Sequence, residues 1–277
     1  AYSGAMKVLS NIEDKAAGNG ALNAIPESDG VYRRIPMFVT LKDKIYPSLV
    51  AESLRVAQDA STFIIQAVGA SGEEGFGETG LVSFKVGAVK VPTDENGQIW
   101  VRFTGDIPER YVPAWKLLDG SAPAEKLEGH IVLIGTSAAA MKDLRATPLD
   151  PAAAGVSLHA EALETILTGN FLNRPDFAHG LEVVASFLLG LLLIWLLPKW
   201  GSVWCAVLTF VAIVGVVGGA WYAFDVYNWL LDPIYFSVVI LVVYLTQSLL
   251  IFLATEAERS RVRGAFGMYL SPALVEQ

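Results

Sequence analysis

Three long apolar runs lie in the last hundred residues, and they constrain the class of this chain more than any other feature. The runs contain no Asp, Glu, Lys or Arg, and they cover 183–197, 203–224 and 233–255. A helix needs about 20 apolar residues to cross the hydrocarbon core of a bilayer. The second and third runs reach that length, and the first reaches it when Leu181 and the edge residue Glu182 are included. We therefore predict three transmembrane helices, over about 181–198, 203–224 and 233–255.

The region before these runs has the composition of a soluble domain. Residues 1–176 carry 16 Lys and Arg against 22 Asp and Glu. An acidic region without a basic patch argues against nucleic acid as a partner. The single cysteine, Cys205, lies inside the second run, which excludes a disulfide framework and a cysteine-based metal site. The first residues lack the apolar core of a signal peptide, so we expect a targeting segment upstream of Ala1.

The charges that flank the runs predict the orientation of the chain, because cytoplasmic loops carry an excess of Lys and Arg. The first turn holds Lys199, the 225–232 turn holds two Asp and no basic residue, and the tail holds Arg259, Arg261 and Arg263. We therefore expect the tail to be cytoplasmic and residues 1–176 to be periplasmic or extracellular. Trp and Tyr cluster near both ends of the runs, as in the aromatic belts of membrane proteins.

The interior of the runs argues against transport. No ionisable residue lies deep in a span, so there is no proton relay or ion path. Gly215, Gly218 and Gly219 in the second run favour close helix approach. Contact between helices of one chain is the commoner interpretation, and a dimer face is the alternative.

Residues 1–176 are expected to mix helices and strands. Strands are predicted over 31–39, ended or interrupted at Pro36, and over 84–91 and 99–103 around a hairpin-type turn at 94–97. Ile131-Val132-Leu133-Ile134 is typical of a strand buried on both faces. Helices are predicted to open at Tyr46-Pro47 and to cover 113–118 and 157–168, the last ended by Gly169, with a Gly-rich loop over 69–80.

Several polar residues near the end of this region are candidate site residues. Gly135-Thr136-Ser137 suggests an anion-binding loop, although a plain exit from the preceding strand is the commoner case. Asp143 and Arg145 are placed to form an ion pair. We expect His159 to be a partly buried histidine on the helix side that also carries Leu163, Ile166 and Leu167. Without a GxSxG elbow, a Ser137, His159 and Asp143 triad is not proposed.

Two groups of motifs resemble the type-two CHASE sensor domain of bacterial receptors. Ala16–Asn23 and Asp29–Pro36 resemble the middle of that domain. Gly129–Ser137, Asp143, Thr147-Pro148 and Gly155–Ala160, followed by Asn173-Arg174-Pro175, are similar to its end. The resemblance implies an extracytoplasmic α/β sensor followed by three spans, with a homodimer and an unidentified external ligand or partner protein. It marks as sensor-motif positions Arg33, Arg34, Asp143, Thr147 and His159.

The tail resembles the connector between a last span and a class III nucleotide cyclase domain. The resemblance covers Glu256–Gln277 and is carried by Phe266, Tyr269, Ser271 and Pro272. Pro272 would change the direction of a helix that continues from the third span. The resemblance implies conversion of ATP to cyclic AMP and diphosphate with Mg or Mn in a cyclase domain beyond Gln277. No catalytic residue, metal site or cofactor is therefore expected within residues 1–277.

Together these features predict an α/β extracytoplasmic sensor domain followed by an α-helical membrane domain of three transmembrane helices. The expected divisions are a sensor over 1–176 that begins upstream of Ala1, spans over 177–255, and a cytoplasmic connector over 256–277. The expected function is the receptor part of an adenylate cyclase in a bacterial inner membrane. A sensor of a histidine or Ser/Thr kinase and a non-enzymatic subunit of a larger membrane complex remain alternatives.

Overall fold

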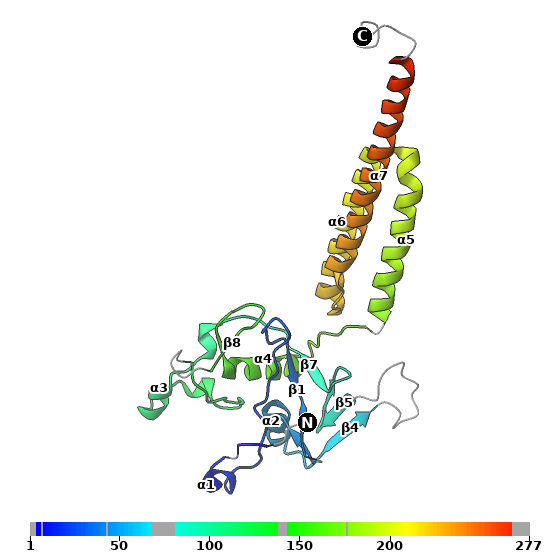
Figure 1. The fold of residues 1–277 in the computed structure, drawn as a ribbon. Helices are drawn as coiled ribbons and strands as arrows, with labels where there is room; N and C mark the ends of the chain where they lie inside the picture. The colour runs from blue at the N-terminus through cyan, green and yellow to red at the C-terminus, as the bar shows by residue number, and fades with distance from the viewer. Residues whose placement is uncertain are drawn as a thin grey trace. The chain divides into compact units, whose positions relative to one another are not determined.

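The structure is a computed structural model that describes residues 4–6, 8–42, 44–67, 81–137, 143–175 and 177–267, with 264–267 as backbone only. The chain divides into two compact units, Ala1–Leu172 and Asn173–Gln277. The ribbon in Figure 1 shows mixed helices and strands in the first unit and three long helices in the second. The predicted order, a mixed domain followed by three apolar helices, is confirmed.

The first unit is built from short elements. Its helices are α1 (Ser10–Glu13), α2 (Leu49–Ala57), α3 (Ala114–Leu118) and α4 (Gly155–Thr168), with 3-10 turns at Pro108–Arg110 and Ala124–Lys126. Its strands are β1 (Arg34–Pro36), β2 (Phe38–Leu41), β3 (Lys44–Pro47), β4 (Phe63–Ala67), β5 (Leu81–Val86), β6 (Val89–Pro92), β7 (Gln98–Trp100), β8 (Leu144–Arg145) and β9 (Ala153–Ala154).

The strands of this unit pair in small antiparallel ladders. Strand β1 pairs with β7, β2 with β3, and β8 with β9, while β4, β5 and β6 form a three-stranded sheet in that order. In the β1–β7 ladder Arg34 lies opposite Trp100 and Ile35 lies opposite Ile99. This ladder joins a segment near residue 34 to one near residue 100, and it positions the polar network described below.

One hydrophobic core holds these ladders and helices together. Helices α2 and α4 contribute Leu54 and Leu158, and the strands contribute Ile35, Phe84 and Ile99, all at most 2% exposed. The rings of Phe38 and Phe63 meet Phe84 edge-on, a geometry that aromatic pairs prefer. Burying such side chains contributes about 1.5–3 kcal/mol each, so this core accounts for much of the stability of the unit.

The two longer helices of this unit follow from recognisable signals. The prediction for 157–168 is confirmed, because α4 ends at Thr168 and the following Gly169 adopts φ +71° as its C-terminal cap. The prediction that a helix opens at Tyr46-Pro47 is wrong, because those residues end β3. Helix α2 begins instead at Leu49, where the Ser48 side chain accepts a hydrogen bond from the Ala51 amide.

The predicted strands are shorter than expected. The segment 31–39 contains parts of two strands, because Met37 separates β1 from β2 and each pairs with a different partner. The segment 84–91 turns at Gly87, whose φ of +54° suits a tight turn, so the hairpin joins β5 to β6. The 94–97 turn therefore leads from β6 to β7 and is not a hairpin. The expected loop over 69–80 lies outside the described residues.

The apolar run Ile131–Ile134 is not a strand buried on both faces. Ile131 and Leu133 pack against the core, while Val132 is 48% exposed and Ile134 is 92% exposed. No ladder between described residues includes the run. Its alternation is that of an extended segment with one face on the core. The prediction failed because no strand in the described part of the chain covers the other face.

The second unit consists of α5 (Phe177–Trp200), α6 (Ser202–Tyr227) and α7 (Pro233–Gly267). These three helices run side by side in Figure 1, and each is long and apolar enough to cross a membrane. Leu193, Phe236 and Ile240 are buried where α5 and α7 meet. At the other end of the helices, the Ser202 hydroxyl lies 3.1 Å from the Tyr244 hydroxyl and 3.0 Å from that of Ser248. Polar contacts of this kind bind helices together in an apolar surrounding.

The glycines of α6 do not make the expected contacts within the chain. A methyl group built on Gly215, Gly218 or Gly219 would meet no other atom of the described structure within 4 Å. The commoner interpretation of these glycines, packing between helices of one chain, is therefore wrong. By contrast, a methyl group on Gly190 of α5 would lie 3.8 Å from Val243 of α7.

Candidate functional site

A tight turn places the first charged residues of the candidate site. The Asp29 side chain accepts a hydrogen bond from the Val31 amide at 3.0 Å, and the Gly30 amide donates to the Glu27 carbonyl at 2.9 Å. Gly30 adopts φ +81°, which a residue without a side chain reaches at no steric cost. The turn therefore directs Glu27 and Asp29 toward the arginines that follow.

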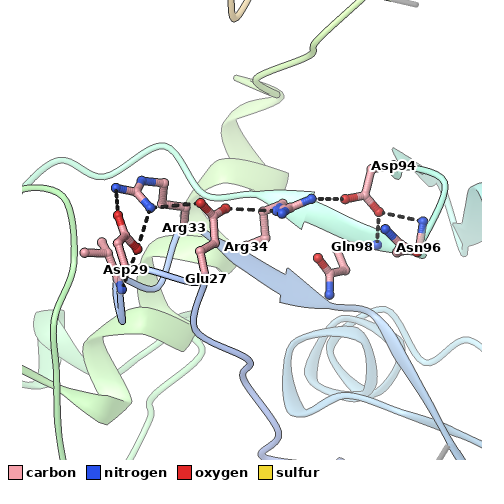
Figure 2. A network of polar contacts seen from close by, with 8 residues as sticks. Glu27, Asp29, Arg33, Arg34, Asp94, Asn96 and Gln98 are labelled. Atoms are coloured by element: carbon pink, nitrogen blue, oxygen red, sulfur yellow. Dashed lines mark hydrogen bonds and ion pairs between the residues drawn. The ribbon is translucent and has the colours of Figure 1, made fainter.

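Arg33 and Arg34 form a network of ion pairs with three carboxylates (Figure 2). Figure 2 shows the Glu27 carboxylate between the two guanidinium groups, 2.9 Å from Arg33 Nη1 and 3.1 Å from Arg34 Nε. Arg33 also binds Asp29 at 2.7 Å, and Arg34 binds Asp94 at 3.1 Å. The arginine side chains are about one third exposed, so water weakens each pair, but a shared carboxylate makes them a unit.

Asp94 connects this network to the β6–β7 turn. Its Oδ1 atom accepts hydrogen bonds from the Asn96 amide at 2.9 Å and the Gln98 amide at 2.8 Å. Its Oδ2 atom accepts from Arg34, whose guanidinium carbon lies 4.7 Å from the centre of the Trp100 ring. The network therefore links three chain segments next to the β1–β7 ladder: the turn at 27–30, the residues at the start of β1, and the β6–β7 turn.

The electrostatics of the network follow from these contacts. The hydrogen bond from Arg33, followed by that from the Val31 amide, lowers the pKa of Asp29 to about 2. The hydrogen bond to Asp29 in turn raises the pKa of Arg33. Asp29 and Arg33 thus stay charged over the whole physiological range, so this pair is not a proton switch.

The other sensor-motif residues form a second cluster around the start of α4. Asp143 pairs with Arg145 at 3.3 Å, as predicted, and Arg145 lies 5.5 Å from the centre of the Tyr32 ring. The Asp143 carbonyl accepts from the Gly155 amide at 2.7 Å, and a methyl group on Gly155 would overlap the Asp143 carboxylate. Thr147 closes a local turn through hydrogen bonds with Asp150.

His159 is buried in this second cluster, 6% exposed, and its Nδ1 atom has no hydrogen-bond partner among the described residues. Burial lowers the pKa of His159, and the nearby Asp143 carboxylate opposes this effect only in part. Leu163 and Ile166 are buried on the same helix, as predicted, but Leu167 is 59% exposed. Leu167 follows His159 by eight residues, which is two full helical turns and about 80° more. Leu167 therefore points away from the buried side of the helix.

A cavity of about 360 Å³ lies beside the second cluster in the first unit. Its polar lining includes Asp106, Tyr111, Ser137, Asp150, Ser157 and Glu161. Glu161 is held by the Thr104 amide and hydroxyl, at 3.0 Å and 2.9 Å from Oε2. Burial, and then the negative charge of Asp106, raise the pKa of Tyr111. The cavity is a candidate binding site for a small ligand that offers hydrogen-bond donors.

The hydrolase and anion-loop interpretations gain no support from this geometry. Ser137 lines the cavity and His159 does not, and no hydrogen bond joins them within the described residues. A methyl group built on Gly135 would overlap the Val156 side chain, so this loop packs directly against α4. No group of three or more His, Cys, Asp or Glu that could hold a metal occurs in the described part of the chain.

The connector residues fall at the edge of the described chain. Helix α7 continues without a break from Pro233 to Gly267, so the backbone of Phe266 lies in its last turn. Tyr269, Ser271 and Pro272 lie outside the described residues. Sequence reasoning found Arg33 and Arg34 but missed Glu27, Asp94 and Trp100, although Asp29-Gly30 and Asp94–Gly97 both carry the signal of a turn.

Most of the chain matches the model of a known protein family. The family model of the CHASE2 domain matches residues 3–217, a range that includes all but the first two residues of the first unit, together with α5 and much of α6. No curated protein and no solved structure matches the chain.

Proposed function

The chain belongs to the CHASE2 domain family, and we propose that it is the receptor portion of a bacterial adenylate cyclase. CHASE2 is an extracellular sensor domain, and the three apolar helices fit a membrane receptor. The proposal adds an output, the synthesis of cyclic AMP from ATP by a cytoplasmic domain beyond Gln277. The sensor would pass an external signal through the membrane helices to that domain.

The observation that carries the proposal is the length and charge of α7. The helix runs for 35 residues, although about 20 suffice to cross a bilayer. It is apolar as far as Thr255 and then continues as the exposed, charged segment Glu256–Arg263. An unbroken helix that leaves the membrane and leads toward the Phe266–Pro272 motif is suited to carry movement to a following domain.

The proposed orientation of the receptor is supported by its flanking charges. Arg259, Arg261 and Arg263 favour a cytoplasmic C-terminus, and Asp225 and Asp232 favour an outer position for the α6–α7 turn. With three spans, we therefore propose that the first unit lies on the periplasmic or extracellular side of the inner membrane. Lys199 lies over the Trp195 ring at 3.5 Å, which suits the inner headgroup region.

We further propose that the receptor works as a homodimer. Gly215, Gly218 and Gly219 meet no other helix among the described residues of their own chain, which leaves them open to a second copy in the membrane. The tail resembles the connector that precedes a class III cyclase domain, and such domains act as dimers with Mg or Mn. A signal could therefore act by changing how two connectors meet. The stimulus would be an external small molecule or protein. The cavity of about 360 Å³ is the candidate binding site for a small molecule.

Cyclic AMP accumulation tests the proposed output. The complete gene that encodes this chain, with the sequence that follows Gln277, is expressed in cells that lack their own adenylate cyclase. The proposal predicts cyclic AMP in those cells, and deletion of the coding sequence after Gln277 should abolish it. A kinase domain after Gln277, or a complete product without cyclase activity, would reject the proposed output in favour of a sensor kinase or a non-enzymatic subunit.

A further inference from the structure

The ends of α5 and α7 that adjoin the α6–α7 turn are joined through the Glu182 carboxylate. Glu182 lies in the second turn of α5, and its side chain is only 10% exposed. Its Oε2 atom lies 3.0 Å from Arg174 Nη2, before α5, and its Oε1 atom accepts a hydrogen bond from the Asp232 amide at 2.9 Å. One carboxylate thus connects two segments that are far apart in the sequence.

Asp232, whose amide donates to Glu182, is the residue directly before α7. The Asp232 side chain accepts a hydrogen bond from the Ile234 amide at 2.9 Å and a longer one from Tyr235 at 3.4 Å. This is the pattern of an N-terminal cap, and Pro233 at the first helical position needs no amide partner. Glu182 therefore fixes the backbone at the point from which the whole of α7 extends.

The main chain makes a second set of contacts between the same two segments. The Asn173 amide donates to the Asn228 carbonyl at 3.0 Å, and the Leu230 amide donates to the Asn173 carbonyl at 2.9 Å. The Phe177 ring meets the Trp229 ring edge-on at 5.6 Å. The segment before α5 cannot move relative to the α6–α7 turn without breaking these contacts.

We propose that these contacts, centred on Glu182, form the joint through which the sensor controls α7, an inference that rests on the proposed receptor function. Leu172 forms a bridge with Trp100 within the first unit and is covalently followed by Asn173. A displacement of Trp100 is thus passed along the chain to Asn173, and then to Asp232 and α7. At about 1.5 Å per residue, α7 carries it over roughly 50 Å. Glu182 acts as a positioning residue that keeps the joint closed.

The joint is tested by the variant Glu182→Gln in the full chain in lipid nanodiscs. Glutamine keeps the shape and can still accept from Asp232, but its amide group faces the donors of Arg174, so the ion pair is lost. Hydrogen exchange of the amides at 230–236 should accelerate about tenfold, the loss expected for a hydrogen bond to a charged group. Because coupling is reciprocal, exchange at Leu172 and Trp100 should accelerate about fivefold as well.

Two further variants keep this test decisive. Arg174→Gln breaks the same ion pair from a more exposed side chain and should reproduce the pattern if Glu182→Gln fails to fold. Asp225→Asn removes an exposed charge from the neighbouring end of α6 and should change neither region. Faster exchange at 230–236 alone would reduce Glu182 to a local cap and overturn the joint, and unchanged exchange everywhere would also overturn it. Neither result would alter the membrane orientation, so the receptor proposal is tested separately.

Discussion

Arg34 and Trp100 lie opposite each other in the β1–β7 ladder, and the guanidinium carbon is 4.7 Å from the ring centre. Arg34 also binds Glu27 and Asp94, so one side chain joins the turn at 27–30 to the β6–β7 turn. Trp100 is the residue whose backbone bridges Leu172, the last residue of the first unit. The arginine network therefore holds the strand that leads to the joint around Glu182.

Replacing Arg34 with Gln should destabilise the first unit by about 1–2 kcal/mol. The change removes two partly exposed ion pairs and one cation–π contact, each worth up to about 1 kcal/mol. Chemical unfolding of the full chain in nanodiscs, followed by tryptophan fluorescence, measures the difference. Lys85→Gln, at an exposed position of β5, is the control and should change stability by less than about 0.5 kcal/mol. An equal effect of both variants would contradict the structural role of the network.

Acidification should destabilise the first unit through His159. Burial lowers the pKa of His159 in the folded state, so the unfolded chain binds this proton more readily. Its contribution to stability is complete above the unfolded pKa of about 6.5 and declines as the pH falls below it. The decline is at most about 1.4 kcal/mol per pH unit. Unfolding measured at pH 7.5, 6.5 and 5.5 should show a shallower dependence in His159→Gln, and an unchanged slope would contradict the assignment.

Replacing Gly155 with Ala should destabilise the first unit by about 1–3 kcal/mol, the usual cost of overpacking. The added methyl group would overlap the Asp143 carboxylate and push it away from Arg145. Gly180→Ala is the matched control in α5, because a methyl group there would meet no other atom of the described residues within 4 Å. The control should be neutral or stabilising, since alanine is the better helix former. Thermal unfolding of both variants decides the matter, and a neutral Gly155→Ala would show that the start of α4 is loosely packed.

Replacing Tyr269 and Pro272 with Ala should change basal cyclase activity in the complete receptor while membrane insertion stays intact. Both residues belong to the motif that resembles a cyclase connector, and Pro272 would set the direction of the chain after α7. Cyclic AMP formation in isolated membranes is the readout, with the amount of inserted protein as the reference. Unchanged basal activity together with an unchanged response to stimulus would remove the connector role.

The parts of the fold that could be predicted from sequence are those set by local chemistry. The spans are set by apolar length, and α4 is set by its apolar side and by the left-handed Gly169. The start of α2 was misplaced because Pro47 resembles a first helical residue, whereas the Ser48 cap defines the true start. Local sequence also could not reveal that no described strand pairs with Ile131–Ile134, because pairing depends on residues distant in the chain.

The candidate site was predictable to a lesser degree. The motif identified Arg33 and Arg34, but Asp94 lies 60 residues away in sequence, and only the fold shows that it binds Arg34. Glu182 was treated as an edge residue of the first span, although its partner is the backbone of Asp232, which no side-chain pattern reveals. Asp143 and Arg145 were paired correctly because they are close neighbours in the chain.

The most direct measurement of the central claim is cysteine labelling of the two ends of the receptor. In a Cys205→Ala background, single cysteines replace the exposed Ser61 or the exposed Ser260, and spheroplasts are treated with a membrane-impermeant maleimide. The account predicts that Ser61→Cys reacts in intact spheroplasts, whereas Ser260→Cys reacts only after the membrane is opened. Reaction of both positions from the same side would contradict a sensor and a connector on opposite faces of the membrane.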